Sequence, residues 1–106
     1  MNRGEVFWVE FGPTIGGEIQ KRRPAIIVSN DVSNRVLNRV QVVPLTSAVS
    51  RVSRGEALVA LNGEQRKALA SQLTTAAKER LLNRAGRLTA ADLKRVEAAL
   101  RLQLDL

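Results

Sequence analysis

The sequence predicts a mainly β domain that ends in one α-helix. Short apolar segments separated by turn signals fill most of the chain, whereas the last segment repeats its apolar residues at helical spacing. With 106 residues, of which 44% are hydrophobic, the chain can build one compact core and is too short for two. We therefore expect a single domain over residues 1–106.

The first strand is expected over Glu5–Phe11. Its apolar side chains occur on both faces, since Phe7 and Val9 alternate with Val6 and Trp8. A strand that is polar on one face would face water there. This pattern instead predicts that the second face is also partly covered.

Further strands are expected at Pro24–Ser29, Val40–Thr46 and Glu56–Leu61. Asn30-Asp31 and Asn62-Gly63 read as turns, and the polar stretch Ser47–Gly55 reads as a loop. The segment Ala68–Ala77 is ambiguous, because its alanines favour a helix while the order of strands favours β structure. We predict a strand there.

A terminal helix is predicted from about Thr89 to Leu104. Thr89 fits an N-cap with an acidic residue three positions later, and apolar residues follow at helical spacing. Ala98, Leu102 and Leu106 lie off the main apolar face. Those residues fit either packing against a second copy of the chain or a role in the core, and the sequence does not decide between them.

The run Lys21-Arg22-Arg23-Pro24-Ala25-Ile26-Ile27 places three cations at the start of an apolar strand. Because proline fixes its own φ and biases the preceding residue toward an extended conformation, Arg23 should be rigidly presented. A rigid cluster of cations suits a phosphate. The same cations also suit a simpler role, in which they keep an aggregation-prone strand soluble.

The charge balance favours a polyanionic partner. Lys and Arg number 17 against 10 Asp and Glu, which gives a net charge of +7 and an isoelectric point near 11.3. Cysteine is absent, as fits a reducing compartment. The apolar runs are far too short for a membrane span, and the first five residues lack the hydrophobic region of a signal peptide. We therefore expect a cytoplasmic protein with no membrane association.

Histidine is absent, which excludes several kinds of catalysis. Two-histidine ribonuclease chemistry, Ser-His or Cys-His acyl transfer, and most zinc or copper sites require an imidazole. The carboxylates are scattered without a close constellation for magnesium, and no phosphate-binding glycine loop occurs. We therefore expect no metal and no cofactor.

The order of motifs resembles the MazF/PemK toxins of bacterial toxin-antitoxin modules. The matching segments are Arg3-Gly4-Glu5-Val6-Phe7-Trp8-Val9, Gly12-Pro13-Thr14, Gly16-Gly17-Glu18, Arg23-Pro24-Ala25-Ile26-Ile27-Val28-Ser29-Asn30-Asp31, Val42-Val43-Pro44-Leu45-Thr46-Ser47, Gln72-Leu73 and Lys78-Glu79-Arg80-Leu81. The resemblance covers nearly the whole chain. It implies a small SH3-like β-barrel of the CcdB/MazF type with a C-terminal helix, and a homodimer. It also implies a metal-independent endoribonuclease that cuts single-stranded RNA at short sequences and is neutralised by a MazE-like antitoxin.

Carried over to this chain, the family's catalytic positions fall on Arg23, Thr46 and Glu18. The 2′-hydroxyl of the RNA would attack the neighbouring phosphorus, and Arg23 and Thr46 would donate hydrogen bonds to the dianionic phosphorane. Because arginine stays protonated, Arg23 suits charge stabilisation, and Glu18 is the better candidate for the base. Read without the family, Glu18 is a solvated loop acid and Thr46 an ordinary residue at a strand end.

RNA contacts are predicted for a set of polar residues around these positions, namely Lys21, Arg22, Ser47, Arg51, Arg54 and Gln72. The chain departs from the family on either side of the expected glutamine. Ser71 and Thr74 stand where relatives commonly place an acid and a cation. The cut sequence therefore cannot be carried over from the family.

Two other functions are compatible with parts of the pattern. A gyrase-poisoning protein of the CcdB type shares the expected fold but lacks the catalytic arginine and presents an aromatic residue near its C-terminus, whereas this chain ends Leu102-Gln103-Leu104-Asp105-Leu106. A non-catalytic basic module that only binds RNA would keep the cations without needing Arg23 and Thr46 together. Cleavage of RNA distinguishes these alternatives.

Overall fold

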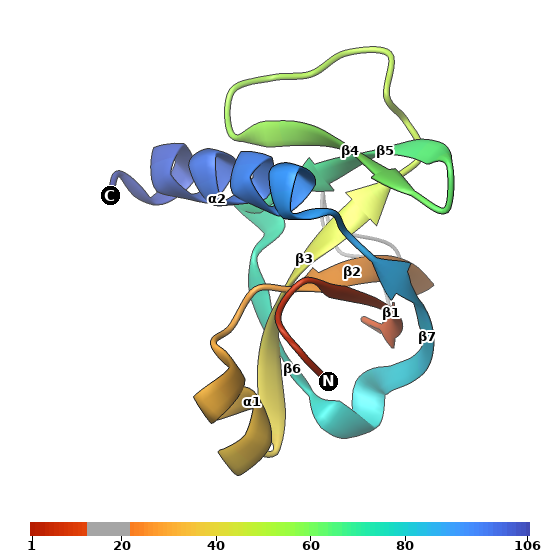
Figure 1. The fold of residues 1–106 in the computed structure, drawn as a ribbon, viewed down its shortest axis with the longest axis vertical. Helices are drawn as coiled ribbons and strands as arrows, with labels where there is room; N and C mark the ends of the chain where they lie inside the picture. Colours follow the sequence, from red (N-terminus) through yellow and green to blue (C-terminus); the bar gives the residue numbers. More distant parts are fainter. Residues whose placement is uncertain (13–21) are drawn as a thin grey trace.

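The central strand, β3 (Arg39–Thr46), pairs with other strands along both of its edges. One edge pairs with β2 (Arg22–Ile27), which leads through β1 (Glu5–Glu10) to β7 (Leu81–Arg87). The computed structural model describes residues 1–12 and 22–106, and within them every strand pair is antiparallel (Figure 1).

The other edge of β3 is shared between two partners. Its N-terminal half pairs with β6 (Thr74–Ala77), and its C-terminal end pairs with β5 (Glu64–Leu69), whose far side carries β4 (Glu56–Leu61). Pro44 lies at the gap between the two. The Gln41 carbonyl accepts from Val28 N–H, so the backbone groups of Gln41 point toward β2. Successive residues of a strand point their backbone groups to alternate edges, so those of Pro44, three residues later, point toward the gap. Proline has no N–H to donate, and none is needed there.

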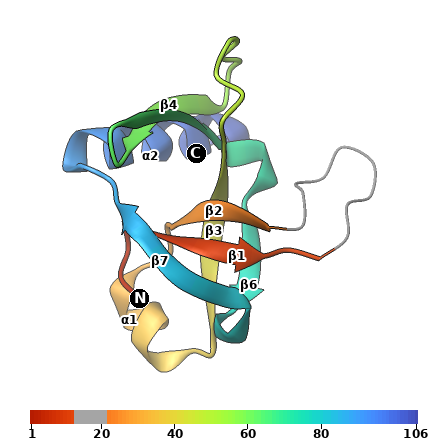
Figure 2. The same ribbon diagram turned by 90° about the vertical axis from the view of Figure 1, so that its right-hand side faces the viewer.

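Figure 2 shows how the sheet curls. It has an apolar cluster on each face, which explains why β1 and β2 are apolar on both sides. The larger cluster lies between the sheet and helix α2 (Ala90–Leu104) and includes Val6, Ile26 and Leu45. The second cluster includes Val9 and Ile27 and packs against Phe7 and Phe11. Coverage of both faces of the first strand, predicted from its pattern, is therefore confirmed.

The predicted strands of the N-terminal half and the strand at Glu56–Leu61 are confirmed, but the turn at Asn30-Asp31 is wrong. A short helix, α1 (Asp31–Val36), begins there, and Asn30 caps it by accepting from Ser33 N–H at 2.9 Å. Asn34 of this helix is buried and donates from its amide to the Ser29 carbonyl at 2.9 Å. The helix is stabilised by these polar contacts, which an apolar pattern does not reveal.

The strand predicted over Ala68–Ala77 is also wrong. The segment contains the end of β5, a 3₁₀ turn η1 (Ala70–Gln72) and then β6. Strands β5 and β7 were not anticipated from the sequence. A 3₁₀ turn, η2 (Lys78–Arg80), precedes β7. Both strands are largely polar, with few buried residues, so neither has a strong apolar alternation.

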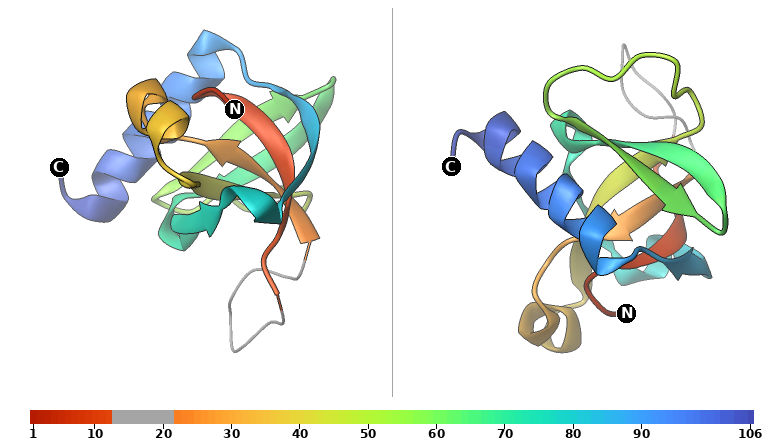
Figure 3. Two further views of the ribbon diagram at one scale, coloured as in Figure 1. Left: turned by 90° about the horizontal axis from the view of Figure 1, so that it is seen from below. Right: turned by 45° about the horizontal axis from the view of Figure 1, so that its top comes forward.

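The terminal helix is confirmed, and so is its cap. Thr89 Oγ1 accepts from Asp92 N–H at 3.1 Å, and Val96 and Ala99 are buried against the sheet (Figure 3). Leu102 and Leu106 are 54% and 86% exposed, so they have no core role within one chain. Packing against a second copy stays a prediction. In the described part of the chain, no helix is both long and apolar enough to cross a bilayer.

Candidate functional site

Arg23 lies in β2, directly after the exposed Arg22 and directly before the buried Pro24. It pairs with Val9 of β1, so its side chain shares a face with the second apolar cluster. The residue is half-buried, and its Nε is buried with no hydrogen-bond partner among the described residues. A buried guanidinium N–H without an acceptor among the described residues is unusual, which marks Arg23 as a candidate site residue.

Thr46 is the last residue of β3 and lies across from Arg23. The β2–β3 register pairs Ala25 with Pro44, and continuing it by two residues brings Arg23 opposite Thr46. The Thr46 Oγ1 accepts from Ala48 N–H at 3.2 Å, which fixes the side chain and leaves its hydroxyl hydrogen free to donate. The two catalytic residues predicted on β2 and β3 are thus neighbours on adjacent strands, on one face of the sheet.

Lys67 of β5 is the next residue along this row, since it pairs with Thr46. Its Nζ lies 3.1 Å from Glu56 Oε1 and donates to the Arg51 carbonyl at 2.8 Å. These contacts hold the Ser47–Gly55 loop beside the end of β3. Lys67 was missed in the sequence because β5 was not recognised as a strand.

Glu56 is the acid that balances Lys67. Its Oε1 also accepts from Ser53 N–H at 2.7 Å. The Ser53 hydrogen bond, followed by the Lys67 ammonium, holds the pKa of Glu56 below its ordinary value despite partial burial. Glu56 therefore stays ionised at neutral pH, and its contact with Lys67 closes the base of the loop.

Two further arginines meet the end of β1. Arg22 Nε donates to Glu10 Oε2 at 2.7 Å, in an ion pair whose Arg22 side chain is 66% exposed. Arg80 of η2 donates from a terminal nitrogen to the Glu10 carbonyl at 3.1 Å, and it was not anticipated as a site residue. Both cations lie next to the strand position that pairs Arg23 with Val9, although Glu10 balances the charge of Arg22, whose side chain points to the other face of the sheet.

The remaining predicted contacts divide into three groups. Ser47, Arg51 and Arg54 are exposed in the loop after β3. Gln72 is half-buried in η1 rather than in a strand as predicted, with Ser71 and Thr74 exposed on either side. The predictions for Glu18 and Lys21 fall outside the described residues. Among the described residues, no group of carboxylates could hold a metal ion.

Known proteins are similar to this one along nearly its whole length. A family model described as PemK-like, MazF-like toxin of type II toxin-antitoxin system matches residues 2–104. Endoribonuclease MazF9 of Mycobacterium tuberculosis is 40% identical over 115 aligned residues, which cover 100% of this chain and 98% of that protein. Endoribonuclease EndoA of Bacillus subtilis is 26% identical over 111 residues, which cover 100% and 96%.

Solved structures show the same fold. A mycobacterial endoribonuclease in complex with its cognate antitoxin has a TM-score of 0.85 at 25% identity, covering 100% of this chain and 96% of that one. MazF from Deinococcus radiodurans also has a TM-score of 0.85 at 25% identity, covering 100% and 97%. The predicted barrel of the CcdB/MazF type with a C-terminal helix is confirmed. The chain therefore belongs to the PemK/MazF family of toxins of type II toxin-antitoxin systems.

Proposed function

We propose that this MazF-family endoribonuclease cleaves single-stranded RNA without a metal, by attack of the RNA's own 2′-hydroxyl. The new bond joins the 2′-oxygen to phosphorus, and the bond to the 5′-oxygen breaks. The products are a 2′,3′-cyclic phosphate and a 5′-hydroxyl end. The family and its endoribonuclease relatives support the activity. The mechanism rests on the arrangement around Arg23.

The single observation that carries the mechanism is the Arg23 guanidinium. Among the described residues, no acid pairs with it and its Nε has no hydrogen-bond partner, and Thr46 lies opposite it with a free hydroxyl hydrogen. When 2′-oxygen attack produces a dianionic phosphorane, donors already fixed in place stabilise that charge without reorganising. Arg23 supplies a planar fork that matches two phosphorane oxygens, and Thr46 supplies a third hydrogen bond.

Proton transfer needs a second group, because arginine remains protonated. Glu18 is our candidate for the base that removes the 2′-hydroxyl proton. Arg23 donates a hydrogen bond to the leaving 5′-oxygen, which takes its proton from solvent. The exposed cations Arg22, Arg51 and Arg54, together with Lys21, would follow the RNA backbone, with Ser47 and Gln72 as polar contacts. In this arrangement RNA affinity comes from many cations, whereas the rate depends on Arg23.

The partners of the toxin follow from its relatives. A related endoribonuclease was solved with its cognate antitoxin, and MazF of Deinococcus radiodurans was solved with MazE. We propose that a MazE-like antitoxin neutralises this chain, that the chain acts as a homodimer, and that both work in the cytoplasm, where the RNA substrate is found.

The decisive experiment maps RNA ends after incubation in a chelator. Purified protein is mixed with a long unstructured RNA in EDTA, and cleavage is expected to continue and to leave 2′,3′-cyclic phosphate and 5′-hydroxyl ends. An RNA with deoxyribose at the mapped cut position should bind and stay intact. Loss of activity in EDTA that magnesium restores, or cutting of the deoxy substrate, would show that the mechanism is wrong. Binding without any cleavage would indicate a non-catalytic module.

A further inference from the structure

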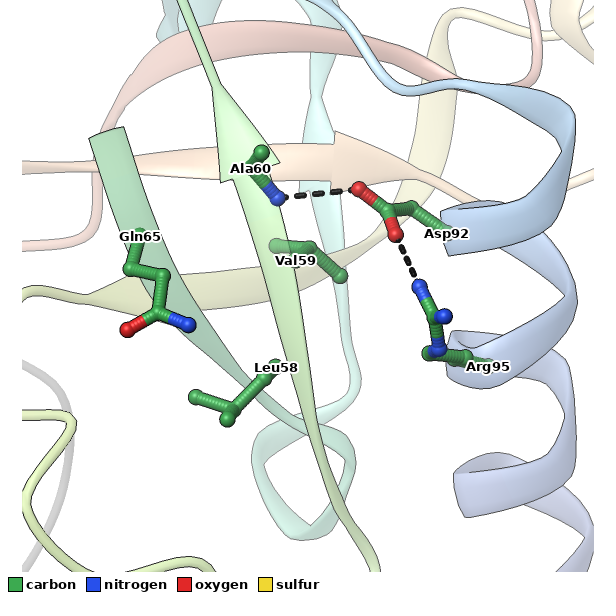
Figure 4. Close-up of a pocket in the computed structure, with 6 residues that line it drawn as sticks. All are labelled: Leu58, Val59, Ala60, Gln65, Asp92 and Arg95. Atoms are coloured by element: carbon green, nitrogen blue, oxygen red, sulfur yellow. Dashed lines mark hydrogen bonds and ion pairs between the residues drawn. The ribbon is translucent and has the colours of Figure 1, made fainter. Parts of the chain in front are cut away.

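β4 is the outer strand at its end of the sheet, and its free edge faces α2. In an antiparallel pair, alternate residues direct their backbone groups to the partner strand, and the others direct them outward. The Ala60 N–H donates outward to Asp92 Oδ2 at 2.9 Å (Figure 4). Leu58 and Glu56, which are two and four residues before Ala60, therefore also direct their backbone groups away from β5.

Two of the three outward N–H groups are already paired. Ala60 is capped by Asp92, and the Glu56 N–H donates to the Ser53 carbonyl at 3.1 Å. Leu58 lies between them, and neither its N–H nor its carbonyl has a hydrogen-bond partner in the described part of the chain. Among the described residues, Leu58 is thus the one outward-facing residue of β4 whose backbone offers both an unpaired donor and an unpaired acceptor.

The open position lies in a groove between β4 and α2. Two adjoining pockets of about 410 and 360 Å³ both include Leu58 and Arg95 in their walls. The wall toward the end of α2 is apolar and includes Val52, Ala98 and Leu102. Leu102 is 54% exposed and Val52 44%, so this apolar wall is open to a partner in the single chain.

Arg95 gives the groove its charge. Its side chain is 62% exposed and uses one terminal nitrogen to bind the Asp92 carboxylate. Its other N–H groups can bind a second carboxylate. The two carboxylates of the groove are already paired, Asp92 with Arg95 and Glu56 with Lys67. In a chain of net charge +7, an acidic segment is favoured here over a basic one.

We propose that this groove binds one extended segment of the antitoxin by addition to the edge of β4. One residue of the segment pairs with Leu58 through two backbone hydrogen bonds, an apolar side chain packs between Ala98 and Leu102, and a carboxylate binds Arg95. Strand addition takes its affinity from the main chain and its selectivity from the flanking side chains. This inference rests on the proposed neutralisation by an antitoxin and adds the place and the chemistry of one contact.

Amide hydrogen exchange tests the backbone contact directly. In the free protein the Leu58 amide should exchange fast and the Val59 amide, which faces β5, slowly. Addition of the full-length cognate antitoxin should slow Leu58 by about tenfold or more, while Val59 changes little. Val59 is thus an internal control on the same strand.

A matched pair of variants tests the side-chain contact. Arg95→Ala should weaken antitoxin binding by about tenfold. Arg101→Ala removes the same charge from the same helix outside the groove and should change binding by less than about twofold. Both variants should cleave free RNA like the parent, because neither residue lies in the row of Arg23 and Thr46. Thermal unfolding of each variant checks that Arg95→Ala folds, and Arg95→Lys should recover part of the affinity.

The outcomes separate this inference from the proposed function. If the antitoxin inhibits cleavage while Leu58 stays fast and Arg95→Ala binds normally, the groove is not the docking site, although neutralisation stands. If Leu58 is protected in the free protein and loses protection on dilution, a second copy fills the groove and the inference is wrong. If the antitoxin neither binds nor inhibits, both proposals fail.

Discussion

At the scale of single residues, the site depends on how Arg23 is presented. Pro24 follows it and pairs with Trp8 of β1, so the backbone at this point is fixed between two strands. The neighbouring Arg22 is paired with Glu10 and mostly exposed, whereas the Arg23 Nε is buried and has no hydrogen-bond partner in the part of the chain that the structure describes. Two consecutive arginines therefore differ in exposure and pairing, and we propose a catalytic role only for Arg23.

The first residue-scale prediction concerns Arg23→Lys. The substitution keeps one positive charge but removes the planar fork, so RNA affinity should change little while single-turnover cleavage falls by about 10²- to 10³-fold. Lys21→Ala is the control and should weaken RNA binding slightly without changing the cleavage step. Parent-like cleavage by Arg23→Lys would mean that Arg23 only keeps the strand soluble.

The second residue-scale prediction concerns Glu56. The Ser53 N–H hydrogen bond, followed by the Lys67 ammonium, lowers the pKa of this carboxyl below its ordinary value. Because the pKa is lower in the folded state, ionised Glu56 stabilises the fold at any pH above its pKa in the unfolded chain. This stabilisation is lost as the pH falls through its pKa in the folded protein. Between about pH 5 and pH 3, Glu56→Gln should therefore lose less stability than the parent. Denaturant midpoints measured across this range test it, and parallel curves for the two proteins would contradict it.

At the scale of elements, polar contacts hold the segments that lack a strong apolar pattern. α1 has one buried residue, Asn34, which is 2% exposed and bonds to both the backbone and the side chain of Ser29. Ser29 in turn accepts from Gln41 N–H at 3.0 Å, so the helix is tied to β3. This network positions α1 on the sheet in place of a hydrophobic face.

Asn34→Ala should therefore destabilise the protein by about 1–3 kcal/mol, because the buried Ser29 carbonyl loses its donor. Asn38→Ala makes the same substitution at an exposed position and should change the free energy of unfolding by no more than about 0.5 kcal/mol. Chemical denaturation of the two variants measures the difference. Equal effects would show that the Ser29–Asn34 network contributes no stability.

At the scale of the whole molecule, β3 organises the fold. It pairs with β2 on one edge and changes partner from β6 to β5 on the other, so the Thr46 end of β3 lies where the β4–β5 hairpin joins the sheet. The C-terminal leucines of α2 remain exposed in the single chain, as Leu104 is 49% and Leu106 86% exposed. Exposed leucines at a helix end are consistent with the homodimer that we propose.

Sedimentation is expected to show that the chain is a dimer. The affinity of this dimer for RNA should fall as the salt concentration rises. The logarithm of the affinity should fall with the logarithm of the salt concentration, with a slope of about −0.7 for each phosphate contacted. Binding titrations at several salt concentrations give the slope. A monomer that cleaves RNA at the full rate would refute the dimer, and a flat salt dependence would refute the backbone contacts.

The sequence by itself determined the apolar strands, the capped terminal helix and the family. Strands buried on both faces, such as β2, are apolar throughout, and Thr89 is a local N-cap signal, so neither depends on distant partners. Arg23 and Thr46 could be named from the family motifs. Their approach could not, because it follows from the register between β2 and β3.

Only the tertiary structure decided the polar elements and their contacts. β5 and β7 are largely polar strands held by pairing with their neighbours, so Lys67 entered the site through a register that no local pattern encodes. The open edge at Leu58 likewise follows from the strand order, because β4 is the last strand at its end of the sheet and has no strand beyond it. Local sequence fixes burial and caps, whereas long-range pairing decides which polar groups meet.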